Sequence, residues 1–299
     1  MEIVIKNLSK NYGKKTVLKN VSLTIPSGMY GLLGRNGAGK TSLLRVLATL
    51  STSSGGEVYM NGISIKETGK IRKSVGYLPQ DFSFYKNMRV YDAMDYLGLL
   101  SNIPDKIRQE RIVALLAQVN LTENMKTKVK ALSGGMKRRL GIAQAMLHDP
   151  QILIVDEPTA GLDPEERIRL CNLLSEFAEN RIVIFSTHIS SDLASSCENI
   201  GVLDQGRILW HGRTDELIKY AEGKVYLISA DKKQDKWIKE KYTVLHIMSF
   251  GAEMQYRVLS DTVPEEKHIS QDPTLEDGYM YLLRQTDGGV YHEVVPKRV

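Results

Sequence analysis

The sequence predicts an α/β fold built on a mostly parallel sheet, and three features indicate it. A glycine-rich turn at Gly34–Thr41 follows the short apolar run 29–33 and precedes a helical pattern. Two longer apolar runs, 151–156 and 181–186, are typical of strands that are covered on both faces. A helical pattern at 165–178 joins them, as expected for parallel neighbours. Ligands bind such sheets at the carboxyl ends of the strands.

The glycine-rich turn fits the pattern G-x-x-x-x-G-K-S/T without a gap. Its glycines let backbone N–H groups converge on an anion, and the following helix adds the positive end of its dipole. We expect Lys40 to bind the terminal phosphates and Thr41 to hold a magnesium ion. The turn therefore predicts a P-loop NTPase core that binds a nucleoside triphosphate. The expected nucleotide contacts are Gly34, Arg35, Asn36, Gly37, Ala38, Gly39, Lys40, Thr41 and Ser42.

The composition is that of an ordinary globular protein with one large and one smaller domain. The chain has 299 residues, of which 25% are charged and 42% hydrophobic. The net charge of +5 comes from interspersed basic and acidic residues, so we expect no nucleic-acid partner. No apolar run approaches the roughly 20 residues of a membrane span, and the start lacks a signal sequence, so we expect a cytoplasmic chain. Cys171 and Cys197 have no metal-site or redox spacing and should be buried thiols.

An antiparallel β region is expected on both sides of the glycine-rich turn. The first hairpin turns at 11–15, and the second turns at Asn61-Gly62, a type I′ signal. Tyr12, at the tip of the first hairpin, is either a surface residue or an aromatic that stacks on a nucleotide base. The expected strands are 2–8, 17–25, 57–60 and 63–65.

A helical subdomain is expected at about 81–147, inserted into the α/β core. A short strand at 75–78 precedes it and ends at Pro79-Gln80, and the stretch 81–88 is rich in aromatic residues. Apolar residues then recur with helical spacing in three segments. These segments are 90–100, 105–119 and 135–147.

Four polar residues follow the predicted core strands and point to hydrolysis. Asp156 ends a buried strand, where it can hold the magnesium ion bound by Thr41. Glu157 is placed to act as the general base that polarises the attacking water. Gln80 can reach both the metal and the water, and His188 can hydrogen-bond the γ-phosphate.

A second glycine turn, Leu132–Met136, precedes a helix and forms an anion cradle without a phosphate of its own. Such a cradle requires a second molecule. Here the sequence resembles the nucleotide-binding subunits of ABC transporters, whose LSGGQ signature binds the γ-phosphate of ATP held by the opposite subunit. The resemblance implies this role for Ser133, Gly134 and Gly135. Met136 replaces the usual glutamine but lies beyond the phosphate contacts, so we expect hydrolysis to be kept.

The resemblance covers residues 1 to about 220. It identifies Gly34–Thr41 as Walker A, Gln80 as the Q-loop residue, the ILIVDEP stretch as Walker B and His188 as the switch histidine. Gly161-Leu162-Asp163 resembles the D-loop, which makes Asp163 a candidate nucleotide contact. The resemblance also implies that Tyr12 stacks on adenine, and Val17 is a further candidate contact on that side.

The same resemblance implies partners and a mode of action. Two ATP-binding subunits, identical or paired, would enclose two ATP molecules with Mg²⁺ in a head-to-tail dimer. ATP would drive closure because it binds the closed state more tightly than the open state. The SGGMKRR and DEPTAGLDP segments are most similar to those of ABC-2 type exporters, whose transmembrane permease is a separate chain. The chain would then lie on the inner face of the cell membrane.

Residues 223–299 are expected to form a small accessory α+β domain. The element order is β-α-β-β-α-β, which suggests a ferredoxin-like arrangement. Thr274 and Asp277 form a capping box in a stretch similar to one near the end of ABC-2 exporter ATPases. We favour a domain that braces the dimer over one that senses a ligand. The expected strands are 225–228, 244–248, 254–259 and 290–294, and the helices are 233–241 and one from Leu275.

Two other functions are weighed against export. A soluble ABC-type ATPase acting on DNA or ribosomes would carry a long coiled-coil insertion or two ATPase cassettes, and this sequence has neither. A small-molecule kinase with the same phosphate-binding turn would explain neither the second glycine turn nor the adjacent acids Asp156 and Glu157.

Overall fold

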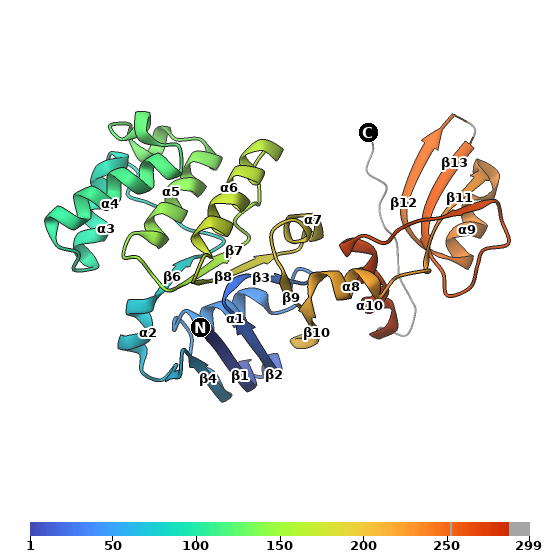
Figure 1. The fold of residues 1–299 in the computed structure, drawn as a ribbon, viewed down its shortest axis with the longest axis horizontal. Coiled ribbons are helices and arrows are strands. Elements are labelled where there is room, and N and C mark those ends of the chain that lie inside the picture. The colour runs from blue at the N-terminus through green and yellow to red at the C-terminus, as the bar shows by residue number, and fades with distance from the viewer. Residues whose placement is uncertain (252, 287–299) are drawn as a thin grey trace. The chain divides into compact units, whose positions relative to one another are not determined.

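The computed structural model describes residues 1–251 and 253–286 of the chain (Figure 1). The chain divides into two compact units, Met1–His211 and Gly212–Val299, so the division lies upstream of the boundary expected after residue 222. Helix α8 (Thr214–Lys219) belongs to the second unit, where it packs against α10 (Leu275–Thr286). Among the described residues, no helix is long and apolar enough to cross a membrane.

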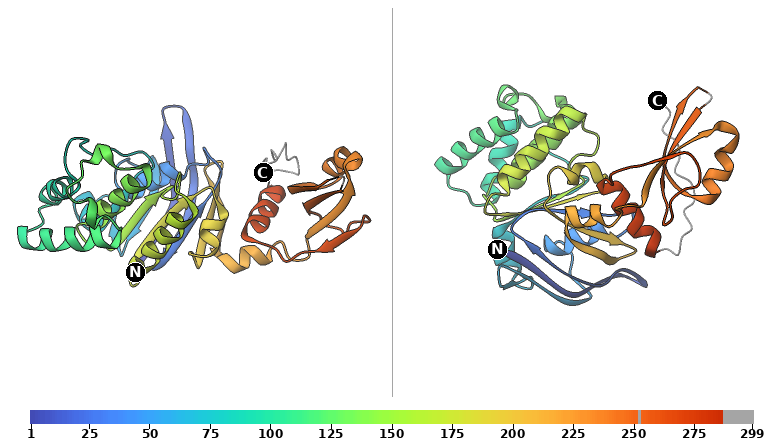
Figure 2. Two further views of the ribbon diagram at one scale, coloured as in Figure 1. Left: turned by 90° about the horizontal axis from the view of Figure 1, so that it is seen from above. Right: turned by 45° about the vertical axis from the view of Figure 1, so that its right-hand side comes forward.

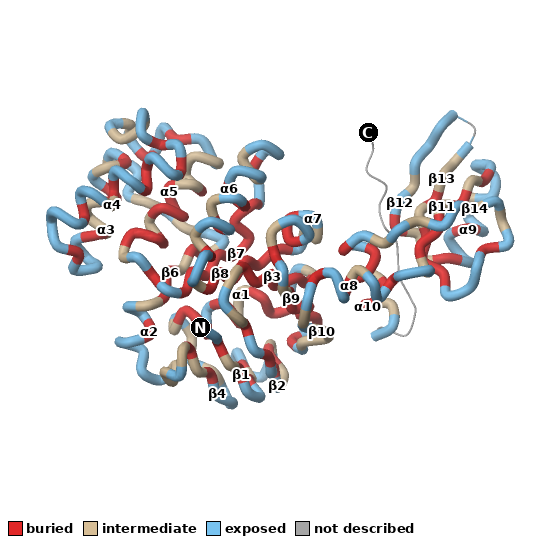
Figure 3. The backbone as a smooth tube through the Cα atoms, viewed as in Figure 1, coloured by how far each residue is buried: buried red, intermediate tan, exposed pale blue. Residues whose placement is uncertain are grey.

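A six-stranded sheet forms the centre of the first unit, in the order β10-β9-β3-β8-β7-β6. The pairs β3–β8, β7–β8, β6–β7 and β3–β9 are parallel, which confirms the predicted α/β core. Strands β3, β7 and β8 are almost entirely buried (Figure 3). The strands are β3 (Gly28–Leu33), β6 (Val75–Leu78), β7 (Ile152–Asp156), β8 (Ile182–Thr187), β9 (Asn199–Asp204) and β10 (Arg207–Arg213).

The second sheet of this unit has the order β2-β1-β4-β5 and is antiparallel, as predicted. Its strands are β1 (Glu2–Tyr12), β2 (Lys15–Pro26), β4 (Gly55–Met60) and β5 (Ile63–Ser64). The hairpin of β1 and β2, blue in Figure 2, extends beyond the six-stranded sheet. Apolar side chains of this sheet share one core with α1 (Lys40–Leu47) and the six-stranded sheet, including Ile3, Leu44, Ile154 and Ile184.

Helices cover the other side of the six-stranded sheet (Figure 1). The three predicted helical segments are found as α3 (Val90–Leu100), α4 (Asp105–Gln118) and α5 (Gly134–Met146). These helices pack on one another, and α5 also contacts β6 and β7, so α5 connects the helical region to the sheet. The other helices that the structure describes in this unit are α6 (Pro164–Phe177), α7 (Ser190–Ala194) and α2 (Thr68–Ser74), with short 3₁₀ turns at Thr122–Asn124 and Val129–Ala131. Ile71 of α2 belongs to the core shared with the antiparallel sheet.

The second unit contains a four-stranded sheet in the order β12-β13-β11-β14. Its elements after α8 are β11 (Val225–Asp231), a 3₁₀ turn (Lys232–Gln234), α9 (Asp235–Lys241), β12 (Thr243–Phe250), β13 (Glu253–Leu259), β14 (His268–Ser270) and α10. The β-α-β-β start agrees with the prediction. The stretch between the predicted strand 254–259 and the predicted helix from Leu275 contains β14, which occupies the sheet edge beside β11. The described order is therefore β-α-β-β-β-α rather than ferredoxin-like. The strand predicted at 290–294 lies outside the described residues.

Asp277, at the start of α10, is a buried carboxylate held by two neighbouring residues. Its oxygens accept hydrogen bonds from Arg257 Nε at 3.0 Å and Nη2 at 2.6 Å. They also accept from the Thr274 amide at 2.7 Å and from its hydroxyl at 2.6 Å. The Asp277 amide donates back to the Thr274 hydroxyl at 3.3 Å, which confirms the predicted capping box. Burial acts to raise the pKa of Asp277, but the hydrogen bonds from Arg257 and Thr274 outweigh it and lower that pKa.

Asp277→Asn should lower the free energy of unfolding by about 3 kcal/mol at neutral pH, because it leaves the Arg257 guanidinium without its carboxylate. A depressed folded-state pKa stabilises the protein above the unfolded-state pKa, and this stability is lost as the pH falls through the folded value. The difference between the two proteins should therefore shrink in acid. Urea unfolding of the full chain at several pH values measures it. Asp272→Asn, at an exposed neighbour, is the control, and equal midpoints for both variants would contradict the prediction.

Candidate functional site

The carboxyl ends of β3, β6, β7 and β8 meet at one edge of the six-stranded sheet, because these strands are parallel neighbours. The segments that follow them form the candidate site. The phosphate-binding turn follows β3, Gln80 follows β6, Glu157 follows β7 and His188 follows β8. Four segments from distant parts of the sequence are thus brought together, as the sequence predicts.

The turn after β3 has the backbone geometry of a phosphate cradle. A Cβ on Gly34 would lie 2.3 Å from the Leu203 carbonyl oxygen, so only glycine fits there. Gly39 has a φ of 112°, which favours glycine, and it immediately precedes α1. Lys40 Nζ donates to the carbonyls of Gly34 at 2.6 Å and Arg35 at 3.3 Å, so the ammonium group lies inside the turn. The N–H groups in the first turn of α1 add to this electropositive cradle.

The Glu157 carboxylate lies between Lys40 and His188. Its Oε1 is 3.4 Å from Lys40 Nζ, and its Oε2 is 2.7 Å from His188 Nδ1. Lys40 and Glu157 are buried, whereas the His188 side chain is 44% exposed and open to an incoming group. Glu157 itself has a left-handed backbone with a φ of 52°. Its amide donates to the Ser186 carbonyl and hydroxyl, each at 3.1 Å, and its carbonyl accepts from Arg138.

Asp156 is a buried carboxylate with one oxygen paired and the other unpaired. It is completely buried, and its Oδ1 accepts a hydrogen bond from the Ser186 hydroxyl at 2.6 Å. Its Oδ2 is buried without a hydrogen-bond partner among the described residues. Buried carboxylate oxygens are normally paired or bound to a cation. The described residues contain no cluster of three or more acidic, histidine or cysteine ligands.

Ser186 and Arg138 hold this site but were not predicted from the sequence. The Ser186 hydroxyl bonds the Asp156 carboxylate and the Glu157 amide. The sequence feature that could have indicated it is a polar residue at the end of an otherwise apolar strand. Arg138 lies in α5 and donates to the Gln80 carbonyl at 2.7 Å. Its acceptors are backbone carbonyls, which no sequence motif marks.

Comparisons with known proteins agree with this geometry. A family model described as ABC transporter matches residues 18–160. An uncharacterized ABC transporter ATP-binding protein of Bacillus subtilis (strain 168), YxlF, is 36% identical over 238 residues, with 79% of each chain covered. The chain belongs to the ABC transporter ATP-binding proteins. It is therefore an ATP-binding ATPase subunit, and the resemblance found in the sequence is confirmed.

A second relative and a solved structure support this assignment. The Nod factor export ATP-binding protein I of Cupriavidus metallidurans (strain CH34) is 38% identical, with 72% of each chain covered. The ATP-binding cassette MJ0796, solved as a dimer in a post-hydrolysis state with ADP and Pi, superposes with a TM-score of 0.64. It is 25% identical, and the match covers 71% of this chain and 98% of that one.

Tyr12 and Val17, the expected adenine-side contacts of this ABC ATPase, lie beside the phosphate-binding turn. The Val17 carbonyl oxygen would be 3.2 Å from a Cβ on Gly39. Tyr12 ends β1 and is 45% exposed, and Lys10 Nζ lies 4.7 Å from the centroid of its ring. Burial acts to raise the pKa of Tyr12, but hydrogen bonds with Ser42 and Ser51 outweigh it and lower that pKa. An exposed ring next to the start of α1 is what stacking on adenine requires, and this role stays a prediction.

The signature turn of this ABC ATPase, Leu132–Met136, leads into α5 and lies close to the start of α6. The Ser133 hydroxyl caps α5 by accepting from the Met136 amide at 3.2 Å. Asp163 caps α6 by accepting from the Glu166 amide at 2.8 Å, and the Glu166 carboxylate lies against Gly135. Ser133 and Gly134 are exposed.

Proposed function

We propose that this ABC ATPase drives export through a separate transmembrane permease, working as a dimer at the inner face of the membrane. The proposed ATP hydrolysis is supported by the position of the Glu157 carboxylate between Lys40 and His188. The proposed role in export is supported by the two segments that resemble ABC-2 type exporters and by a relative named for Nod factor export. A soluble ABC ATPase with a non-transport role is not favoured, because the named relatives are transporter subunits.

In the proposed reaction, Glu157 is the general base. Its carboxylate would take the proton of the water that attacks the γ-phosphate. Lys40 would stabilise the negative charge on the transferred phosphoryl group, and His188 would hydrogen-bond the γ-phosphate to orient it. The short His188 contact fixes one carboxylate oxygen while Lys40 faces the other, so the base is held in one orientation.

We propose that Asp156, Thr41 and Gln80 hold a magnesium ion together with ATP. The buried and unpaired Oδ2 of Asp156 supports this, because a hard cation with oxygen ligands would satisfy it. Thr41 lies in the first turn of α1, and Gln80 follows the neighbouring strand β6. When bound there, magnesium would neutralise charge on the β- and γ-phosphates.

We propose that Ser133, Gly134, Gly135 and Asp163 act on the ATP of the opposite subunit, in a homodimer or a pair with a second ATPase. The exposed signature turn at the N-terminus of α5 supports this, because it offers an anion site apart from the chain's own phosphate-binding turn. The second unit would brace this dimer.

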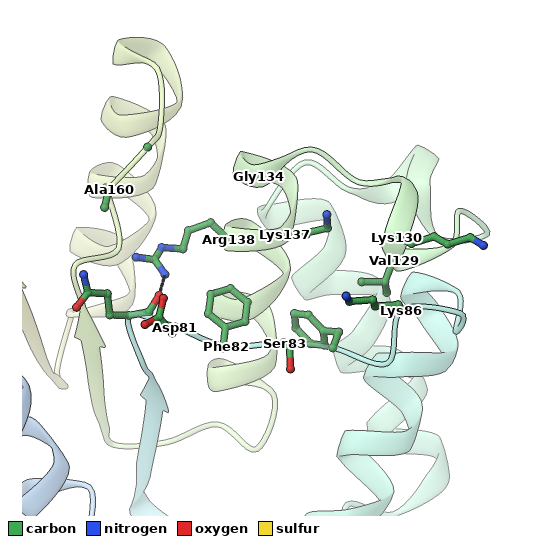
Figure 4. Close-up of a pocket in the computed structure, with 13 residues that line it drawn as sticks. Asp81, Phe82, Ser83, Lys86, Val129, Lys130, Gly134, Lys137, Arg138 and Ala160 are labelled. Atoms are coloured by element: carbon green, nitrogen blue, oxygen red, sulfur yellow. Dashed lines mark hydrogen bonds between the residues drawn. The ribbon is translucent and has the colours of Figure 1, made fainter.

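The permease is proposed to dock at a cavity of about 720 Å³ beside Gln80 (Figure 4). The cavity is lined by the segment after β6, by α5 and by the loops before α5 and after β7. The Phe82 and Phe84 rings meet edge to face there, with centroids 5.7 Å apart, and both are partly buried. Tyr85 is 59% exposed and is an available anchor. Docking here would connect the permease to the loop that holds Gln80.

Phe84→Ala and Tyr85→Ala should lose association with the permease while keeping ATP turnover and thermal stability. Aromatic anchors are worth on the order of 2 kcal/mol or more each when a partner buries them fully. Copurification from native membranes, with identification of the associated chain, measures this and tests the proposed function. Trp237→Ala, at an exposed aromatic of the second unit, is the control. Lost stability with retained association would show that Phe84 and Tyr85 serve the packing of the helical region instead.

A further inference from the structure

Arg138 of α5 is a buried arginine that bonds three carbonyls in two loops of the site. Its side chain is 8% exposed. Nη1 donates to the Gln80 carbonyl at 2.7 Å, Nε donates to the Pro158 carbonyl at 3.1 Å, and Nη2 donates to the Glu157 carbonyl. The guanidinium lies over the Phe82 ring, 5.6 Å from its centroid (Figure 4). One side chain thus joins the loops that follow β6 and β7.

The charge of Arg138 is not neutralised by a direct ion pair. Among the described residues, no carboxylate lies within 4.0 Å of its guanidinium, and its partners are carbonyl dipoles. Burial lowers the pKa of Arg138, and the charges of Asp156 and Glu157 act in the opposite direction. Burying a charge costs stability, and an apolar side chain of similar volume would pack at lower cost. A role beyond packing is therefore the better explanation for an arginine here.

Two of these three bonds hold the backbone at Glu157. The left-handed φ of 52° at Glu157 is sparsely populated by residues other than glycine and persists only where neighbours hold it. Ser186 fixes the Glu157 amide from one side, and Arg138 fixes the Glu157 and Pro158 carbonyls from the other. Without Arg138, the carbonyl side would be free to turn, and the carboxylate would leave its place between Lys40 and His188.

We propose that Arg138 is a positioning residue for ATP hydrolysis, which holds the Glu157 backbone in its left-handed conformation and ties it to the Gln80 loop. This rests on the proposed role of Glu157 as general base. Because Arg138 lies in the helix that the signature turn begins, a movement of α5 on the partner's ATP would be passed to the chain's own Glu157. The arginine then links the two ATP sites of the dimer.

The test is ATP turnover and ATP binding by purified full-length Arg138→Gln. A misplaced base should lower kcat by between about tenfold and a hundredfold, while the Kd for ATP changes by less than about twofold. Arg108→Gln is the matched control, because Arg108 is 6% exposed and bonds Asp95 and the Ile103 carbonyl within the helical region. It should lose stability but keep kcat. Equal kcat values for the two variants would overturn the proposal.

Two further variants separate positioning from other roles. Arg138→Lys keeps the charge but replaces the planar guanidinium, whose three nitrogens reach separate carbonyls, by a single ammonium nitrogen, so its kcat should also fall by at least about fivefold. This variant serves as the test if Arg138→Gln fails to fold. In a Glu157→Gln background, Arg138→Gln should change the residual turnover by less than about twofold. A further independent loss there would overturn the proposal. Normal ATP turnover by Glu157→Gln alone would refute the role of Glu157 as general base. Low turnover by Glu157→Gln together with normal turnover by Arg138→Gln would refute only the role of Arg138.

Discussion

Glu157→Gln should lose ATP hydrolysis by a factor of about 10² to 10⁴ while ATP binding remains intact, because that is the usual contribution of a general base. The amide has nearly the shape of the carboxylate and can still accept a hydrogen bond from Lys40, but it cannot take a proton from water. The carbonyls of Gly34 and Arg35 in the phosphate-binding turn accept hydrogen bonds from Lys40. Steady-state turnover and equilibrium ATP binding by the purified chain measure the two effects separately.

The control for this substitution is Glu165→Gln, because Glu165 is an exposed acid on α6 whose carboxylate pairs with Arg169 at 2.6 Å. It should turn over ATP normally. Removing the Glu157 charge should also favour the closed, ATP-bound dimer, which the molar mass in solution with and without ATP would show. Near-normal hydrolysis by Glu157→Gln would remove Glu157 from the role of base.

The core of the fold could be predicted because its strongest patterns are local. Strand β6 and helix α3 have the residues that apolar spacing indicates, Val75–Leu78 and Val90–Leu100. The buried strands β7 and β8 are equally clear, since both faces are covered and nearly every residue is apolar. The proximity of Lys40, Glu157 and His188 could be predicted because the carboxyl ends of neighbouring parallel strands lie at the same edge of a sheet.

The elements that could not be predicted depend on contacts between distant parts of the chain. Strands β9 and β10 extend the central sheet beyond β3, yet β10 is partly exposed and has no sustained apolar run. Strand β14 has only three residues and is defined by its pairing with β11. Propensity is weak over such lengths, and sheet pairing decides the structure.

The supporting residues of the site were harder to predict than the reacting ones. The motif spacing predicts the role of Glu157 but not its positive φ. Hydrogen bonds from Ser186 and Arg138, which lie in two other segments, hold the Glu157 backbone in that conformation. The arginine donates to carbonyls, so its partners carry no side-chain signature. Ser133 and Gly135 were recognised from the signature pattern, but a single chain contains only half of the composite site that they are proposed to complete.

A mixture of Lys40→Ala and Ser133→Arg subunits should recover ATP turnover that neither variant shows alone. In a head-to-tail dimer, each ATP is bound by the phosphate-binding turn of one subunit and the signature turn of the other. A mixed dimer then has one site with both lesions and one site with none. If equal amounts mix at random and the two sites act independently, about a quarter of the wild-type turnover should return.

The decisive control is a mixture of Lys40→Ala with Glu157→Gln. Lys40 and Glu157 lie 3.4 Å apart in one chain, so every site of that mixed dimer carries one of the two lesions. This mixture should recover nothing, although its subunits pair as readily. A tag on one variant, followed by a pull-down, verifies that mixed dimers form. Equal recovery in both mixtures would indicate subunit exchange or contamination. No recovery in the first mixture, despite verified mixed dimers, would contradict independent ATP sites that are shared between the two subunits.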